Sequence, residues 1–227
     1  RRGLRRAFYR AGWFLMKENV KKVLNELLNR YPALSEQEGN IIAAFEILKN
    51  AYANGNKLLT CGNGGSAADS EHIVGELMKR FKKPREIESA VAKKLAAFGA
   101  TGEKLAGDLE GALPAISLTS HIALSTAFAN DKEPSAVFAQ QVYGLGVCGD
   151  VLICISTSGN SENCYLAAIT AKSKGIKVIS LTGKTEGRLS SVSDVTIFAP
   201  ETETYKVQER PLPIYHALCA MLEEEFF

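Results

Sequence analysis

The sequence contains no apolar run that approaches the roughly 18 residues needed to cross a bilayer, so no membrane span is expected. It has five cysteines, but no two of them form a CxxC pair and their number is odd. Most of them stand among apolar residues, which favours buried thiols in a reducing cytosol over disulfides or a thiolate zinc site. Histidine is also scarce, with three residues in 227, so each histidine can be weighed separately.

Most of the chain has no large excess of positive or negative charge. The formal net charge is +2, and five arginines lie within residues 1–15, which hold no acidic residue; removing these five leaves −3 for the remainder. A near-neutral body argues against a nucleic-acid groove, which requires clustered lysine and arginine. Residues 1–15 do not resemble a signal peptide, and we expect a solvated basic tail there. The sequence leaves open whether this tail is a helical extension or lies upstream of a start at Met16.

Short apolar segments alternate with helical patterns along most of the chain. Five segments are predicted as strands, at residues 56–61, 114–118, 150–155, 177–181 and 194–198. Helices are predicted at residues 17–30, 35–53, 67–81, 121–129, 134–144, 161–174 and 209–225, the second of them opening on a capping box of Ser35 and Glu38. This order predicts an α/β fold in which helices cover both faces of a parallel sheet. In such sheets, ligands bind beyond the carboxyl ends of the strands.

Residues 82–113 interrupt the alternation. A polar bend opens this segment, residues 86–98 are predicted as a helix, and Gly99 and Gly102 punctuate a further turn. The segment is too short to build its own core. We therefore expect a helical insertion within a single domain of residues 35–227, preceded by an N-terminal extension and helix in residues 1–34.

The turn after the third predicted strand is rich in hydroxyl groups, which come from Ser156, Thr157, Ser158 and Ser161. Such hydroxyls can donate hydrogen bonds to phosphate oxygens. Gly159 allows close approach of the backbone, and the amides that open the next helix point at the same anion. A helix N-cap needs one hydroxyl only, so four of them within six residues favour a phosphate site over a simple cap.

A second turn of this kind, Gly62-Asn63-Gly64-Gly65-Ser66, follows the first predicted strand. It does not match GxGxxG, so a dinucleotide site is not indicated. A tight turn capped by Ser66 explains it equally well when it is taken alone. Two such turns at strand ends in one domain nevertheless support each other.

His72 and Glu76 are spaced four residues apart on a predicted helix and therefore share one face, which Asp69 and Arg80 extend. A histidine and a carboxylate so arranged suit a zinc-like ion or a general base. A surface ladder of ion pairs accounts for the same spacing, and this alternative stays open.

The other two histidines have simpler explanations when the residues are considered alone. His216 stands among apolar residues near the start of the last helix, where a core histidine is the common case. His121 can simply cap a helix. The residues alone do not link Gln208 to a metal.

These motifs recur together, in this order, in a known family. The recurring residues are Cys61–Ser66, His72, Glu76, Ala129–Asp131, Ile155–Ser161, Leu181–Lys184, Val207–Glu209 and Tyr215–His216. They resemble the sugar isomerase (SIS) fold and, within it, the phosphoheptose isomerases, over roughly residues 36–227. The resemblance implies a flavodoxin-like three-layer sandwich around a five-stranded parallel sheet. It also implies homotetramers whose active sites lie near subunit interfaces, while the cysteine pattern above points to the cytoplasm.

The resemblance also implies a set of site residues. Substrate-binding positions fall on Asn63, Gly64, Gly65, Ser66, Glu76, Arg80, Asn130, Asp131, Ser156, Thr157, Ser158, Ser161 and Gln208. Zinc-ligand positions fall on His72, Glu76, Gln208 and His216. Glu76 is the implied base and His216 its acid/base partner. Because a metal-bound carboxylate is a poorer base, the sequence leaves open whether Glu76 moves protons or only binds metal.

The activity that the resemblance implies is the isomerisation of D-sedoheptulose 7-phosphate to D-glycero-D-manno-heptose 7-phosphate, for heptose and surface-polysaccharide synthesis. The alternative is a non-catalytic SIS protein that binds a sugar phosphate or associates with DnaA. The DnaA-associating relative lacks the glutamate and the last histidine, and both are present here. Three features depart from the family pattern, namely the long connection at residues 82–113, Pro211 in place of a frequent histidine, and Tyr205 in place of a frequent acid.

Overall fold

The structure, a computed structural model, describes Trp13 and residues 16–227. The predictions made for the basic tail fall on residues that lie, apart from Trp13, outside this part of the chain. Five parallel strands form one sheet in the order β2-β1-β3-β4-β5. Their bounds are β1 Leu58–Gly62, β2 Ala115–Ser117, β3 Val151–Ser156, β4 Lys177–Thr182 and β5 Val195–Phe198. The predicted α/β class and the five-stranded parallel sheet are confirmed.

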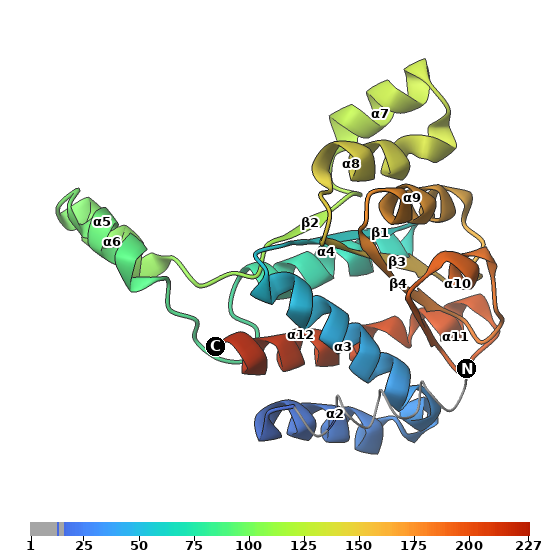
Figure 1. Ribbon diagram of the computed structural model, residues 1–227, viewed down its shortest axis with the longest axis horizontal. Helices are drawn as coiled ribbons and strands as arrows, with labels where there is room; N and C mark the ends of the chain where they lie inside the picture. Colours follow the sequence, from blue (N-terminus) through green and yellow to red (C-terminus); the bar gives the residue numbers. More distant parts are fainter. Residues whose placement is uncertain (1–12, 14–15) are drawn as a thin grey trace.

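Helices cover both faces of the sheet (Figure 1). One core joins alternate strand residues, such as Val151, Ile153 and Ile155, to helices α2, α3, α4 and α12. The opposite core joins Leu152 and Cys154 to helices α8 and α9 and to α10. Side chains alternate between the faces because successive residues of a strand point in opposite directions. The bounds are α2 Glu18–Arg30, α3 Glu38–Ala53, α4 Gly65–Met78, α12 Pro211–Phe226, α8 Val137–Leu145, α9 Glu162–Ser173 and α10 Arg188–Val192.

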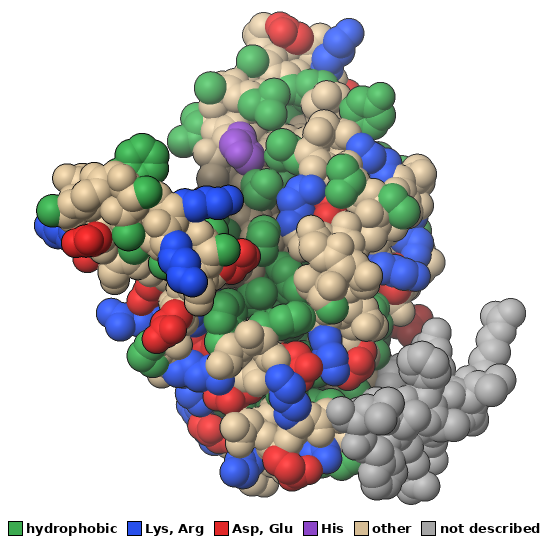
Figure 2. Space-filling view, turned by 60° about the vertical axis from the view of Figure 1, so that its left-hand side comes forward, with side chains coloured by type: hydrophobic (Ala, Val, Ile, Leu, Met, Phe, Trp, Pro, Cys, Tyr) green, Lys and Arg blue, Asp and Glu red, His purple; other side chains and the backbone are tan. Residues whose placement is uncertain are grey.

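Two short helices, α5 (Ser89–Ala96) and α6 (Ala100–Asp108), occupy the segment where a helical insertion was predicted. They form an arm that stands away from the body, with apolar side chains on its surface (Figures 1 and 2). A Cβ atom at Gly102 would lie 1.8 Å from the Leu95 carbonyl oxygen, so the two helices of the arm can approach this closely only with glycine there. Phe98 at the tip is 80% exposed.

Several local predictions were wrong in detail. Ser35 does not cap a helix, because Pro32 opens a 3₁₀ segment, η1 (Pro32–Gln37), that contains it, and α3 begins at Glu38 without a side-chain cap. Helix α4 ends at Met78, three residues early, because Lys79 takes an extended backbone conformation. Helices α10 and α11 (Thr204–Gln208) were not predicted, being only five residues long. Among the described helices, none combines the length and apolarity that a membrane crossing requires.

Candidate active site

The serine-rich turn joins β3 to α9 at the carboxyl edge of the sheet. The hydroxyls of Ser156 and Ser161 lie 2.8 Å apart, and Gly159 has φ +66°, a left-handed conformation that favours glycine. Ser161 is the N-cap residue of α9, yet its side chain makes no capping hydrogen bond. An N-cap hydrogen bond from Ser161 therefore does not account for the hydroxyls of this turn. The Cys164 N–H donates to Asn163 Oδ1 at 3.0 Å, and the amides before it open α9 toward a bound anion.

The glycine-rich turn joins β1 to α4 beside it, because β1 and β3 are neighbours in the sheet. Asn63 and Asn163, the latter on α9, exchange two side-chain hydrogen bonds of 2.9 and 2.8 Å. Gly64 has φ +56°, and a Cβ atom at Gly62 would lie 2.5 Å from the Ser66 carbonyl oxygen. The two turns are thus tied together, and both have backbones that need glycine.

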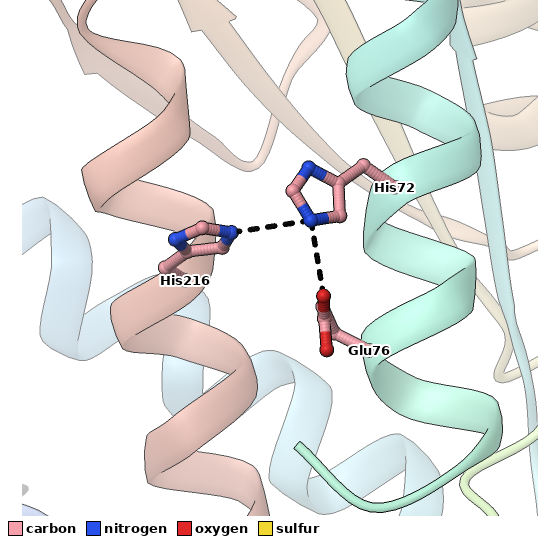
Figure 3. Close-up of side chains that lie close together, drawn as sticks. All are labelled: His72, Glu76 and His216. Atoms are coloured by element: carbon pink, nitrogen blue, oxygen red, sulfur yellow. Dashed lines mark hydrogen bonds and ion pairs between the residues drawn. The ribbon is translucent and has the colours of Figure 1, made fainter. Parts of the chain in front are cut away.

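A cluster of three potential metal ligands lies between α4 and α12 (Figure 3). His72 Nε2 lies 3.0 Å from Glu76 Oε1 and 3.5 Å from His216 Nε2. The ligand atoms of all three residues lie within 4.8 Å of one another. The spacing of His72 and Glu76 predicted a shared face, and the structure adds a histidine from a second helix. A ladder of surface ion pairs along one helix does not account for that third member.

The hydrogen bonds of Tyr215 orient His72. The Tyr215 hydroxyl donates to Asp69 Oδ1 at 3.0 Å and lies 3.1 Å from His72 Nδ1. Burial, together with Asp69, raises the pKa of Tyr215, so its single proton stays on the oxygen and points at the carboxylate. The hydroxyl must then accept from the Nδ1–H of His72. In the neutral ring, Nε2 therefore carries the lone pair that faces Glu76 and His216.

Burial and the neighbouring His72 lower the pKa of His216. Its neutral form, which is the form that binds metal, is therefore favoured at neutral pH. Two imidazole nitrogens and a carboxylate oxygen converge here, and a bound cation would take the place of the protons that otherwise join them. This donor set suits zinc, and the His72–Tyr215–Asp69 chain supplies the outer hydrogen bond that a ligating histidine normally has. The residues present therefore fit a metal ion.

Within a single chain, some of the residues that the resemblance assigned to the site lie away from the His72–Glu76–His216 cluster. Gln208, at the end of α11, lies over the start of α4, since a Cβ atom at Gly65 would be 3.7 Å from its Nε2 atom. Arg80 lies beyond the end of α4 and pairs instead with Glu110 at 3.0 Å, so it does not extend the helical stripe as predicted.

Asn130 and Asp131 end α7 (Ile122–Asp131), which packs on α8 and on the 3₁₀ turn η2 (Pro134–Ala136). Figure 1 shows α7 at the outer side of α8, away from the α4–α12 cluster. His121 precedes α7 at the N-cap position, but its Nδ1 atom lies 2.7 Å from Gln141 Oε1 and it makes no cap hydrogen bond. His121 therefore stands at the predicted N-cap position, but its side chain does not cap the helix.

Sequence reasoning did not single out Tyr215 as a functional residue. The available signal was its place directly before His216 on the last helix. Its partner Asp69 was placed on the His72 face, but the link between the two helices could not be read from spacing within either one.

The sequence matches the SIS domain family over residues 21–183. With a five-stranded parallel sheet and two phosphate-type turns at its carboxyl edge, the chain belongs to the SIS domain family. It is 39% identical over 212 residues to a phosphoheptose isomerase of a Nitratiruptor species, covering 93% of this chain and 100% of that one.

A phosphoheptose isomerase of Clostridium acetobutylicum is 40% identical over 182 residues, which make up 80% of either chain. The solved phosphoheptose isomerase of Neisseria gonorrhoeae superposes with a TM-score of 0.69 at 30% identity, covering 91% of this chain and 98% of that one. Within the SIS proteins, this chain belongs to the phosphoheptose isomerases.

Proposed function

We propose that this protein is an aldose–ketose isomerase that converts D-sedoheptulose 7-phosphate to D-glycero-D-manno-heptose 7-phosphate through an enediol. The observation that carries the proposal is the convergence of His72, Glu76 and His216 at one point between α4 and α12. A protein that only binds a sugar phosphate has no need of such a cluster. The presence of Glu76 and His216 therefore disfavours the non-catalytic, DnaA-associating alternative.

The serine-rich turn holds the phosphate in this proposal, through the hydroxyls of Ser156, Thr157, Ser158 and Ser161 and the first amides of α9. The glycine-rich turn, Asn63 to Ser66, lines the sugar beside it, with Gln208 and Arg80 at its rim. Binding the phosphate far from C1 positions the reacting carbons without changing their chemistry.

Replacing Gly159 by alanine should weaken phosphate binding. Alanine at φ +66° is strained, and its Cβ atom would lie 3.2 Å from the Gly187 Cα atom. Backbone strain of this kind costs about 1–3 kcal/mol, so we expect KM for the sugar phosphate to rise about tenfold or more with a smaller change in kcat. Gly144→Ala, where nothing lies within 4 Å of the new methyl group, is the control. An unchanged KM in Gly159→Ala would remove this turn from the phosphate site.

His72, Glu76 and His216, with Gln208 as a fourth ligand, would hold a zinc ion. Such an ion supplies positive charge that stabilises the negatively charged oxygens of an enediolate. Glu76 takes the proton from C1 of the ketose and returns it to C2. His216, kept neutral by its lowered pKa, moves the proton between the two oxygens. The two carboxylate oxygens of Glu76 would let this one residue both bind a metal ion and accept the proton; Oε1 lies 3.0 Å from His72 Nε2.

Asn130 and Asp131 complete the site in this proposal from a neighbouring subunit of a homotetramer. Support comes from α7 itself, which has no buried residue and presents Ile122, 74% exposed, to its surroundings. We further propose that the enzyme works in the cytoplasm, since all five cysteines are free thiols, as is typical of a reducing compartment.

The direct test is to incubate the full chain with sedoheptulose 7-phosphate and Zn²⁺ and to detect the heptose phosphate by chromatography or NMR. Parallel incubations with fructose 6-phosphate and ribulose 5-phosphate identify the preferred chain length. We expect turnover with the seven-carbon substrate to exceed the others. Absence of heptose phosphate from zinc-loaded protein would overturn the proposed substrate.

A further inference from the structure

A buried ion pair lies next to the His72–Glu76–His216 cluster and takes no part in the chemistry proposed above. Arg85, in the chain after α4, and Glu223, on α12, are both buried, and Arg85 Nε donates to Glu223 Oε1 at 2.8 Å. The guanidinium also lies against the Phe227 ring, 4.9 Å from its centroid. Burying two charges requires desolvation that their attraction barely offsets, so stability alone is a weak reason for this pair.

Arg85 binds the C-terminal end of α4. Its Nη2 atom donates to the carbonyl oxygen of Glu76 at 3.0 Å, and its Nη1 atom donates to that of Leu77 at 2.8 Å. The last carbonyls of a helix have no partner within the helix, and a cation there also complements the helix dipole. The planar fork of the guanidinium therefore fixes the backbone of Glu76 itself, a member of the cluster.

Glu223 acts on the α12 side of the cluster, near His216. It lies seven residues after His216, close to two full turns of α12, so it projects from nearly the same face. Its carboxylate accepts from the backbone N–H groups of Phe81 and Lys82 at 2.8 and 2.9 Å. The Phe81 ring in turn packs on the His216 ring, with 5.3 Å between their centroids. Glu223 thus holds both Arg85 and the residue that packs on His216.

We propose that Arg85 and Glu223 are positioning residues that set the separation of α4 and α12, and with it the distance from Glu76 to His216. Both residues are buried, and neither belongs to the proposed substrate-binding set. Only the expected change in kcat rests on the proposed function. The spacing of the three potential metal ligands can be tested by metal affinity alone. Loss of the pair should therefore weaken metal binding and slow catalysis while sparing phosphate recognition.

The test uses the double variant Arg85→Met/Glu223→Gln. It removes both charges: methionine keeps the apolar stem of Arg85, and glutamine keeps the length of Glu223 and one oxygen that accepts from one of the two backbone N–H groups. Affinity for Zn²⁺ is measured by competition with a chromophoric chelator, and denaturant unfolding verifies that the variant folds. Removing an outer partner of a metal site costs about 10–100-fold in affinity, and we expect a loss in that range. We expect kcat to fall with it, while KM for sedoheptulose 7-phosphate stays within about twofold because the Ser156–Ser161 turn is untouched.

The matched control is Lys83→Met/Glu224→Gln. These residues also join the chain after α4 to α12, through an ion pair of 3.2 Å, but neither binds the end of α4. We expect its zinc affinity to equal that of the wild type. Wild-type affinity in a folded Arg85→Met/Glu223→Gln variant would overturn the proposal, as would an equal loss in the control.

Arg85→Lys provides a second route if the double variant does not fold. Lysine keeps the charge opposite Glu223, but its single nitrogen cannot span two carbonyl oxygens and the carboxylate as the guanidinium does. We expect it to fold and to lose about tenfold in zinc affinity; wild-type affinity would overturn the positioning role. If the wild type binds zinc but leaves sedoheptulose 7-phosphate unchanged, the proposed function fails, while the affinity comparison still decides this inference.

Discussion

Glu76→Gln should lower kcat by about 10²–10⁴-fold, the range expected for the loss of a positioned general base. Glutamine has nearly the same shape, so the packing between α4 and α12 is kept. The amide cannot accept a proton as the proposed base would, and it removes the negative charge from a cluster whose other two members are imidazoles. KM should change little, because the proposed phosphate site is the turn after β3. Steady-state kinetics on sedoheptulose 7-phosphate measure both parameters.

Glu71→Gln is the matched control for this prediction. Glu71 lies on the same helix, and its carboxylate accepts a hydrogen bond from the Thr119 hydroxyl at 3.0 Å, outside the metal-type cluster. We expect its kcat to stay within about twofold of the wild type, as is usual for an exposed substitution of small energetic effect. Equal rates for Glu76→Gln and the wild type would exclude Glu76 as the base.

Removal of metal should abolish turnover, and Zn²⁺ should restore it. Treatment with a chelator, followed by dialysis, is expected to leave less than about 1% of the activity, because metal polarisation of the substrate contributes several kcal/mol. His216→Gln should be nearly inactive even with excess Zn²⁺, because it removes the proposed ligand nitrogen and the proposed acid/base partner together. Activity and bound zinc are measured on the same samples.

His121→Gln separates loss of the site from general loss of a histidine. His121 bonds to Gln141 on α8 and is not a member of the cluster. We expect it to bind zinc and to respond to chelator as the wild type does. Full activity after verified removal of zinc would contradict the metal-dependent mechanism. The proton transfers would then have to be explained by Glu76 and His216 without a metal ion.

The order of strands and helices was predictable because each strand is a short apolar run and each turn contains its own glycine or hydroxyl signal. Both turns were also located from sequence, since turn chemistry depends on neighbouring residues. The pairing of His72 with Glu76 followed from helical spacing. The approach of His216 did not, because it depends on how α12 packs against α4, and no pattern within either helix encodes that packing.

The features that the sequence did not predict also depend on contacts between residues far apart in the chain. Arg85 and Glu223 are 138 positions apart in sequence and meet only in the folded protein. The early end of α4 belongs to this set too, since its last carbonyl groups accept hydrogen bonds from the distant Arg85 guanidinium. Arg80 was placed on the helical stripe by counting residues, and the extended Lys79 backbone redirects it toward Glu110.

The division of the cluster between α4 and α12 also matters for how the protein is made. Helix α4 follows the first strand, whereas α12 follows all five strands. Side chains of α12, among them Leu218 and Met221, share one core with the strands, and a domain folds as a unit, so the fold is complete only after the last helix has been synthesised. His72 and Glu76 therefore meet His216 only in the finished chain. A chain shortened before α12 would lose part of its core and one member of the cluster together.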